Sequence, residues 1–190
     1  MKCVIYLYDE SEKKMDFGFY VAKIKSKIFH NRKIMNDFYR KKGVKIGDGC
    51  LICSNIATSE AFLISIGNNC TISTNVSFIT HDYSAHIILE GTSDLYGKIS
   101  IGDNCFIGAN STLLYGVTLG NNILVAAGSI VTKSFTEENI IIAGNPARII
   151  GTWDEYRKKY ANKATPPGDV ISFHDLCQEL KSSDKYLIKR

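Results

Sequence analysis

Large aliphatic side chains recur every six residues through the second half of the chain. The period holds six times without a gap, at Ile101, Ile107, Leu113, Leu119, Val125 and Val131. Two earlier stretches keep the same period, one at Ile46 and Ile52 and the other at Ile66, Ile72 and Phe78. A second series, mostly of smaller side chains, follows four residues behind the first, at Cys50, Ile56, Cys70, Val76, Cys105, Ser111, Val117, Ile123, Ser129 and Phe135.

A strict period of six fits neither an α-helix, with 3.6 residues per turn, nor a long strand, with a period of two. Glycine follows the aliphatic residue at positions 47, 67, 102, 108 and 120, and Asp or Asn comes next at positions 48, 68, 69, 103, 104, 121 and 122. These residue types tolerate left-handed backbone angles, so each hexad predicts a short strand and a tight corner. Three hexads per turn make a triangular prism with the aliphatic residues inside. The pattern therefore predicts a mainly β fold, a parallel β-helix over residues 44–151.

Helical segments flank the predicted prism. Residues 1–43 begin with a short strand-like segment, Cys3–Tyr8, and continue with a helix over 19–42 whose apolar positions share one face. This helix is rich in Lys and Arg, so it could cover the open first coil as a cap or lie on an anionic membrane surface. Residues 152–190 predict a helical extension that starts with a capping box of Thr152 and Glu155 and has a second helix within 172–180.

Composition and charge narrow the range of functions. The 190 residues carry a net charge of +4, which is too little to indicate nucleic acid but suits an anionic ligand. We recognise no secretory signal and no apolar run long enough to span a membrane, so the six cysteines predict reduced thiols and a cytoplasmic protein. Cys50 and Cys53 form a C-x-x-C without a second pair at zinc-site spacing, which favours structural thiols and no metal.

One long loop, residues 80–98, interrupts the repeat and contains two histidines, His81 and His86, with several carboxylates nearby. A histidine can take the proton of a hydroxyl group at neutral pH, and a neighbouring carboxylate can fix its tautomer. Long loops in compact domains are often functional, although both histidines could simply be exposed loop residues.

The hexad aliphatic-Gly-x-x-small-x, together with AAGSIVTK at 126–133 and AGNPAR at 143–148, resembles the hexapeptide-repeat acyltransferases, in their sugar O-acetyltransferase branch. The resemblance covers roughly residues 44–151. It implies a left-handed β-helix, acetyl-coenzyme A as acyl donor, and no metal. It also implies a homotrimer in which one subunit supplies the histidine loop and its neighbour the coenzyme edge.

The resemblance also implies roles for single residues. His81 takes the place of the catalytic base, His86 is a weaker alternative, and Glu90 or Asp94 would orient the base. Coenzyme-binding roles fall on five positions: Ala109, Ala127, Thr132, Lys133 and Arg148. From the residues alone, the alanines could equally be tight corner packing and the two cations ordinary surface charges.

Sugar contacts are expected from aromatic faces and amides around the loop, and the candidates are Asn55, Tyr83, His86 and Tyr96. The predicted function is acetyl-CoA-dependent O-acetylation of a sugar or polysaccharide hydroxyl by direct transfer. One alternative is N-acetylation of a nucleotide-linked amino sugar, and another is a non-catalytic β-helix scaffold. The γ-type carbonic anhydrases share the prism but need three histidines around zinc, and this loop supplies only two.

Overall fold

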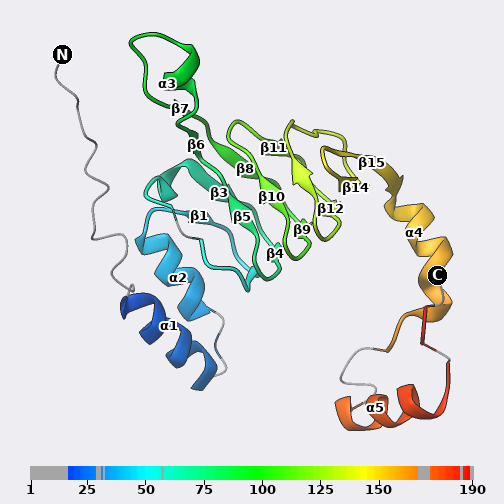
Figure 1. Ribbon diagram of the computed structural model, residues 1–190. Coiled ribbons are helices and arrows are strands. Elements are labelled where there is room, and N and C mark those ends of the chain that lie inside the picture. The colour runs from blue at the N-terminus through cyan, green and yellow to red at the C-terminus, as the bar shows by residue number, and fades with distance from the viewer. Residues whose placement is uncertain are drawn as a thin grey trace.

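Short parallel strands stack into three sheets in the computed structural model, which describes residues 17–28, 31, 33–56, 58–166, 172–184 and 186–188 (Figure 1). The first sheet contains β1 (Lys45–Ile46), β3 (Ile64–Ile66), β8 (Ile99–Ile101) and β11 (Thr118–Leu119). The second contains β2 (Leu51–Ile52), β4 (Thr71–Ile72), β9 (Phe106–Ile107), β12 (Ile123–Val125) and β14 (Ile140–Gly144). The third contains β5 (Ser77–Phe78), β10 (Thr112–Leu113) and β13 (Ile130–Val131).

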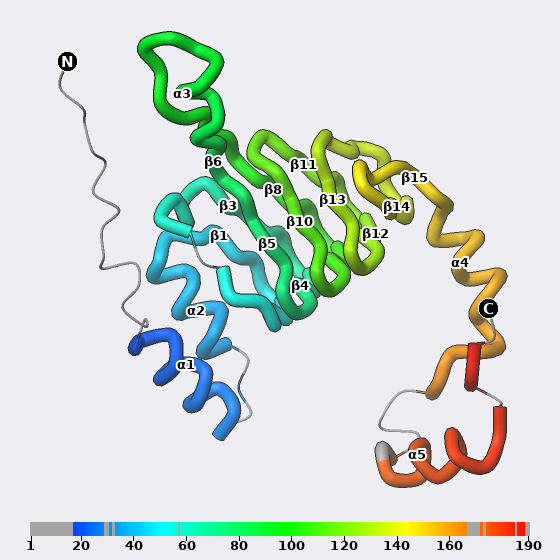
Figure 2. The backbone as a smooth tube through the Cα atoms, viewed as in Figure 1, coloured from blue at the N-terminus to red at the C-terminus, as the bar shows by residue number. Residues whose placement is uncertain are grey.

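In each of the runs β3–β5, β8–β10 and β11–β13, consecutive strands belong to the first, second and third sheets in turn, so the chain winds around a common axis as a stack of coils (Figure 2). This confirms the predicted parallel β-helix, while its left-handed sense stays a prediction from the resemblance. Equivalent positions pair between coils, as in Ile66 with Ile101 and Ile72 with Ile107. The hexad period therefore becomes a ladder in which each side chain lies on its counterpart in the next coil.

Both predicted series of inward residues form the core. Ile107, Leu113 and Val125 have no exposed side-chain surface, and Ser111 and Ser129 of the second series are equally buried. Burying one large aliphatic side chain contributes about 1.5–3 kcal/mol, and the ladder repeats this gain at every coil.

The corners confirm one part of the predicted turn chemistry and correct another. Asn69, Asn104 and Asn122 adopt left-handed backbone angles, with φ of 54°, 56° and 56°. Gly67 and Gly102 do not; instead, a Cβ atom on either would lie 2.7 Å from the glycine carbonyl oxygen of the next coil. These glycines are thus needed for close stacking of the coils and not for a left-handed backbone.

The N-terminal helical segment is two helices, so the prediction of one helix over 19–42 was wrong. They are α1 (Phe17–Ile28) and α2 (Lys33–Lys41), and the Asn31 side chain accepts a hydrogen bond from the backbone N–H of Lys33 at 3.0 Å. Such a cap suits a new helix start. The predicted strand Cys3–Tyr8 lies outside the described residues.

The second helix covers the open first coil. Asn36 donates to the carbonyl of Cys50 and Tyr39 to that of Ser54, both at 2.9 Å. Because Asn36 and Tyr39 are buried, these bonds satisfy backbone groups that a terminal coil would otherwise leave unpaired.

At the other end, β15 (Ala147–Thr152) runs antiparallel to β14 and ends the second sheet. The predicted capping box starts α4 (Trp153–Tyr160): Thr152 Oγ1 accepts from the N–H of Glu155, and Glu155 Oε2 accepts from the N–H of Thr152. A short turn, η3 (Ala161–Lys163), and α5 (Phe173–Ser182) follow. None of the helices described is both long and apolar enough to cross a bilayer.

The interrupting loop is an ordered arm that projects from the prism (Figure 1). Its two sides, β6 (His81–Asp82) and β7 (Leu95–Tyr96), pair antiparallel, and a helical turn, α3 (Ala85–Ile88), lies near its tip. We call residues 80–98 the arm.

Candidate active site

His81 lies at the base of the arm, on the prism corner between the third and first sheets. We call this edge the His81 corner. One segment from each coil reaches it: residues 58–63, which include the turn η2 (Ala61–Leu63), then the arm, then 114–117, then 132–134. Hydrogen bonds between successive coils keep them in register, as from Ile79 N–H to the carbonyl of Leu113 at 2.9 Å.

The closest polar partner of the His81 ring is a carboxylate from the preceding coil. His81 Nδ1 lies 3.1 Å from Glu60 Oε2, with His81 44% and Glu60 16% exposed at their side chains. The same carboxylate accepts hydrogen bonds from three hydroxyls, those of Thr80 at 2.8 Å, Thr58 at 3.0 Å and Ser59 at 2.6 Å.

This environment keeps Glu60 ionised. Burial acts to raise its pKa, but the hydrogen bonds from the three hydroxyls and from His81 outweigh burial and lower the pKa of Glu60 to about 2. An ionised carboxylate can only accept hydrogen bonds, so the 3.1 Å contact requires the proton of neutral His81 to be on Nδ1. The lone pair is then on Nε2, which is the state needed by a general base.

The carboxylate in contact with His81 is thus not one of the two expected from the sequence to orient it. Glu90 is exposed and Asp94 is half-buried in the arm, and among the described residues no hydrogen bond joins either to His81. The register of the repeat could have revealed Glu60: Ile46 pairs with Ile66 and Ile52 with Ile72, an offset that puts residue 60 beside residue 80.

A second polar contact ties the arm to the following coil. The Tyr115 hydroxyl donates to Asp82 Oδ2 at 3.0 Å, and Asp82 Oδ1 accepts from the N–H of Ser84 at 2.9 Å. The hydrogen bonds from Ser84 and Tyr115 lower the pKa of Asp82, and the bond to Asp82 raises the pKa of Tyr115. This contact fixes the arm strand that carries His81.

Of the expected sugar contacts, the structure brings Tyr96 to His81. The two residues face each other across the arm hairpin, with ring centroids 5.7 Å apart. Tyr83 and His86 stack on each other further along the arm, at 4.0 Å, and His86 Nδ1 bonds the carbonyl of Tyr83. Asn55 is exposed on another corner, which follows β2 in the first coil.

Four of the expected coenzyme residues divide between two corners, and the fifth, Arg148, lies in a strand. Ala109 and Ala127 stack on the corner between the second and third sheets, where Gly128 N–H donates to the carbonyl of Ala109 at 2.8 Å. Thr132 and Lys133 are exposed on the His81 corner, two coils beyond the arm. Arg148 is exposed in β15 and donates to the carbonyl of Ala147 at 2.9 Å.

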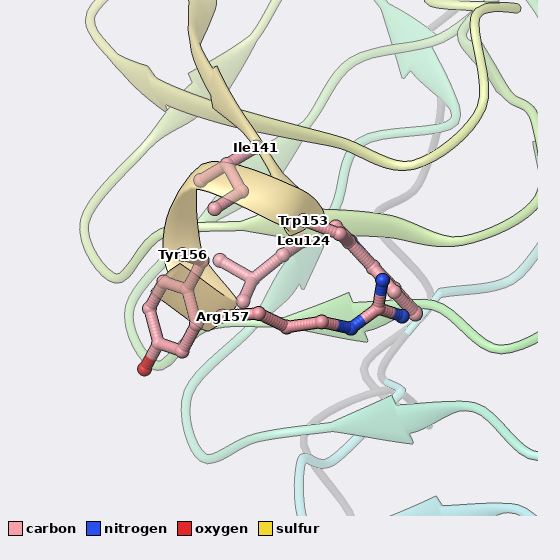
Figure 3. A pocket seen from close by; sticks show the side chains of 5 residues that line it. All are labelled: Leu124, Ile141, Trp153, Tyr156 and Arg157. Carbon is pink, nitrogen blue, oxygen red and sulfur yellow. The ribbon is translucent and has the colours of Figure 1, made fainter. Parts of the chain in front are cut away.

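A small hollow on the outer side of the second sheet is not part of this arrangement. It has a volume of about 100 Å³ and is lined by Leu124, Ile141, Trp153, Tyr156 and Arg157 (Figure 3). Its lining comes from β12, β14 and α4, away from the corner that carries His81.

Three of the cysteines are buried in the core of the prism. Cys50, Cys70 and Cys105 are buried at equivalent positions of successive coils, and their thiols contact backbone carbonyls. Cys53 is exposed, so the C-x-x-C pair does not face one site. In the part of the chain that the structure describes, no cluster of three or more His, Cys, Asp or Glu could hold a metal ion.

The sequence profile described as "Hexapeptide repeat of succinyl-transferase" matches residues 43–79 and 98–133, which are the coils on either side of the arm. Protein CapG of Staphylococcus aureus is 42% identical over 138 residues, which cover 70% of this chain and 80% of CapG. The chain belongs to the hexapeptide-repeat acyltransferase family.

Other members of this family match over a smaller share of their length. Galactoside O-acetyltransferase of Escherichia coli is 32% identical over 118 residues, which cover 62% of this chain and 58% of that enzyme. A hexapeptide-repeat acetyltransferase of Vibrio cholerae, solved with acetyl-coenzyme A, is 22% identical with a TM-score of 0.49; the match covers 64% of this chain and 78% of that one.

Proposed function

We propose that this hexapeptide-repeat protein transfers an acetyl group from acetyl-coenzyme A to a sugar hydroxyl, with His81 as general base. The observation that carries the proposal is the contact between His81 Nδ1 and the ionised Glu60 carboxylate at 3.1 Å. It prepares Nε2 to accept a proton, on a ring that is 44% exposed and so accessible to an acceptor.

The reaction would proceed by direct transfer. His81 Nε2 takes the proton of the acceptor hydroxyl as its oxygen attacks the thioester carbonyl, and backbone N–H groups stabilise the oxyanion. Glu60 stabilises the imidazolium that forms. The tetrahedral intermediate then collapses, the C–S bond breaks, and His81 returns the proton to the leaving thiolate. No bond forms between the protein and the acetyl group.

The coenzyme would lie along exposed small residues and end on exposed cations. Ala127 leaves an open corner for the pantetheine arm, and Lys133 and Arg148 offer charges to its phosphates. Thr132 and Ala109 complete this set by family resemblance. Tyr96, beside His81, offers a flat ring on which a sugar could stack.

The proposed active unit is a homotrimer in which adjacent prisms share each site. The division of the coenzyme residues between two corners supports this, because a neighbouring prism could present Ala109 and Ala127 to the His81 corner. Sedimentation should give a trimer, and a fully active monomer would contradict the proposal. We place the reaction in the cytoplasm, because the free thiols of the core suit a reducing compartment.

The test is thiol release from acetyl-coenzyme A with a panel of oligosaccharides and nucleotide-linked amino sugars, followed by mass measurement of the products. Turnover with an oligosaccharide, and a product acetylated on oxygen, supports the proposal. Turnover only with an amine acceptor would replace it by N-acetylation. No turnover, with a melting temperature unmoved by saturating coenzyme, would favour a non-catalytic scaffold.

A further inference from the structure

The outer face of α1 is apolar and open to solvent. Phe17, Ile24 and Ile28 are 79%, 57% and 64% exposed, and Tyr20, on the same side, is 45% exposed. Their spacing of three, four and four residues puts them on one face of the helix. An apolar helix face of this kind on a soluble domain normally covers a core or binds a partner.

This face is not needed to cover the β-helix. The first coil is already covered by α2, and α1 packs on the outside of α2 through its other face (Figure 2). That inner face includes Ala22, which is buried, and Phe19, which is half-buried and has its ring centroid 6.1 Å from that of Phe38. The helix α1 is thus a second layer at this end of the prism, with its apolar stripe facing outward.

The charges around the stripe indicate what it binds. Residues 1–45 contain twelve Lys or Arg and five Asp or Glu, whereas residues 46–190 contain eleven Lys or Arg and fourteen Asp or Glu. Within residues 17–45 there are nine Lys or Arg and one acid, Asp37. Asp37 is paired with Arg40 at 2.8 Å. Within α1 itself there is no acidic residue, and Lys23, Lys25 and Lys27 are all exposed. The positive charge of the protein is therefore concentrated at the end that carries the stripe.

We propose that α1 binds the surface of an anionic phospholipid bilayer, with Phe17, Ile24 and Ile28 inserted among the acyl chains and its lysines on the lipid phosphates. A helix with one apolar face and flanking lysines has the chemistry of an interfacial helix. Because α1 has only 12 residues, the binding is reversible. Because it depends in part on attraction between lysines and lipid phosphates, salt weakens it. The first coil, with Glu60, then lies nearest the lipid. This proposal does not rest on acetyl transfer.

The experiment is co-sedimentation of the full-length protein with vesicles of phosphatidylcholine alone, or with about one third phosphatidylglycerol. We expect binding only to the anionic vesicles, and its loss in high salt. Each lysine near such a surface contributes about fivefold to the binding constant, so Lys23→Gln with Lys27→Gln lowers it about 25-fold. Ile24→Ser with Ile28→Ser should abolish binding. The matched control is Lys158→Gln with Lys163→Gln, which changes two exposed lysines outside this region and leaves binding unaltered.

Three outcomes would overturn the proposal. They are equal binding to neutral vesicles, no binding at low salt, and binding that both lysine double variants weaken alike. Self-association that Ile24→Ser removes, without vesicle binding, would assign the stripe to a second copy of the chain. If the isoleucine variant does not fold, the proposal is still tested by the salt dependence of wild-type binding and by the comparison of the two lysine double variants. Thiol-release activity on a soluble acceptor should be unchanged in every folded variant, so a failure here is distinguishable from a failure of the proposed function.

Discussion

Replacing Glu60 by Gln tests the reasoning about the site most sharply, because the side chain keeps its shape and loses its charge. When His81 becomes an imidazolium, the Glu60 carboxylate at 3.1 Å stabilises it. At an effective dielectric of about 20, two unit charges at this distance attract by about 5 kcal/mol. His81 is 44% exposed, so solvent screens the pair and about 2 kcal/mol is a reasonable net value. Glu60→Gln should therefore lower kcat about 30-fold.

The comparison needs two matched variants. Glu90→Gln and Asp94→Asn neutralise the arm carboxylates that make no bond to His81, and kcat should stay within about twofold of wild type in steady-state thiol release. The double variant His81→Ala with Glu60→Gln should be no slower than His81→Ala alone, because Glu60 acts through His81. A Glu60→Gln enzyme with wild-type kcat, or losses that multiply in the double variant, would refute the assignment.

The same substitution has a stability signature that depends on pH. Folding lowers the pKa of Glu60 from 4.5 to about 2, which stabilises the native protein by about 3 kcal/mol at neutral pH. For a lowered carboxyl pKa, this contribution is fully present above the unfolded value and is lost as the pH falls towards the folded value. The difference in unfolding free energy between wild type and Glu60→Gln should thus fall to roughly half or less between pH 5 and pH 3 in urea titrations. A difference that grows over this range would contradict the account.

Three further substitutions test the rest of the structure. Leu113→Ala, at a core position with no exposed surface, should lower the unfolding free energy by about 2–5 kcal/mol in urea titrations. Phe106 is 43% exposed on the outside of the prism, so Phe106→Ala should lower the unfolding free energy by clearly less. Thr152→Ala removes the capping box of α4 and should cost about 0.5–2 kcal/mol, seen as faster hydrogen exchange in α4 with kcat unchanged. Tyr115→Phe removes the hydrogen bond to Asp82, so the arm amides should exchange faster and kcat should fall, whereas unchanged exchange would show that the arm does not need this bond.

The regular part of the fold could be predicted from the sequence, because the hexad period has a direct physical meaning. Each aliphatic residue pairs with its counterpart one coil away, so a one-dimensional period becomes a stacked core. The Asn residues of the corners were predictable for a similar reason, since few other residues accept a φ near 55°. The glycine positions were also predictable, but their reason is the distance between coils, which a sequence does not display.

The site was harder to predict, because its partners come from different coils. His81 stands out as a histidine in an interrupting loop, but Glu60 lies 21 residues earlier in a stretch that departs from the period. The Tyr115 contact to Asp82 also joins two coils, over 33 residues. The break between α1 and α2 was missed because both helices keep an apolar face, and the local signal is a single side-chain cap from Asn31.

The central claim is that His81 is the base of an acetyl transfer reaction, and steady-state thiol release by His81→Ala tests it most directly. A general base typically contributes about 10²–10⁴ in rate, so kcat should fall by that factor while the affinity for coenzyme A stays at the wild-type value. His86→Ala, in the same arm, should remain within about threefold of wild type. A His81→Ala enzyme that keeps more than about a tenth of wild-type kcat, with coenzyme still bound, would contradict the account.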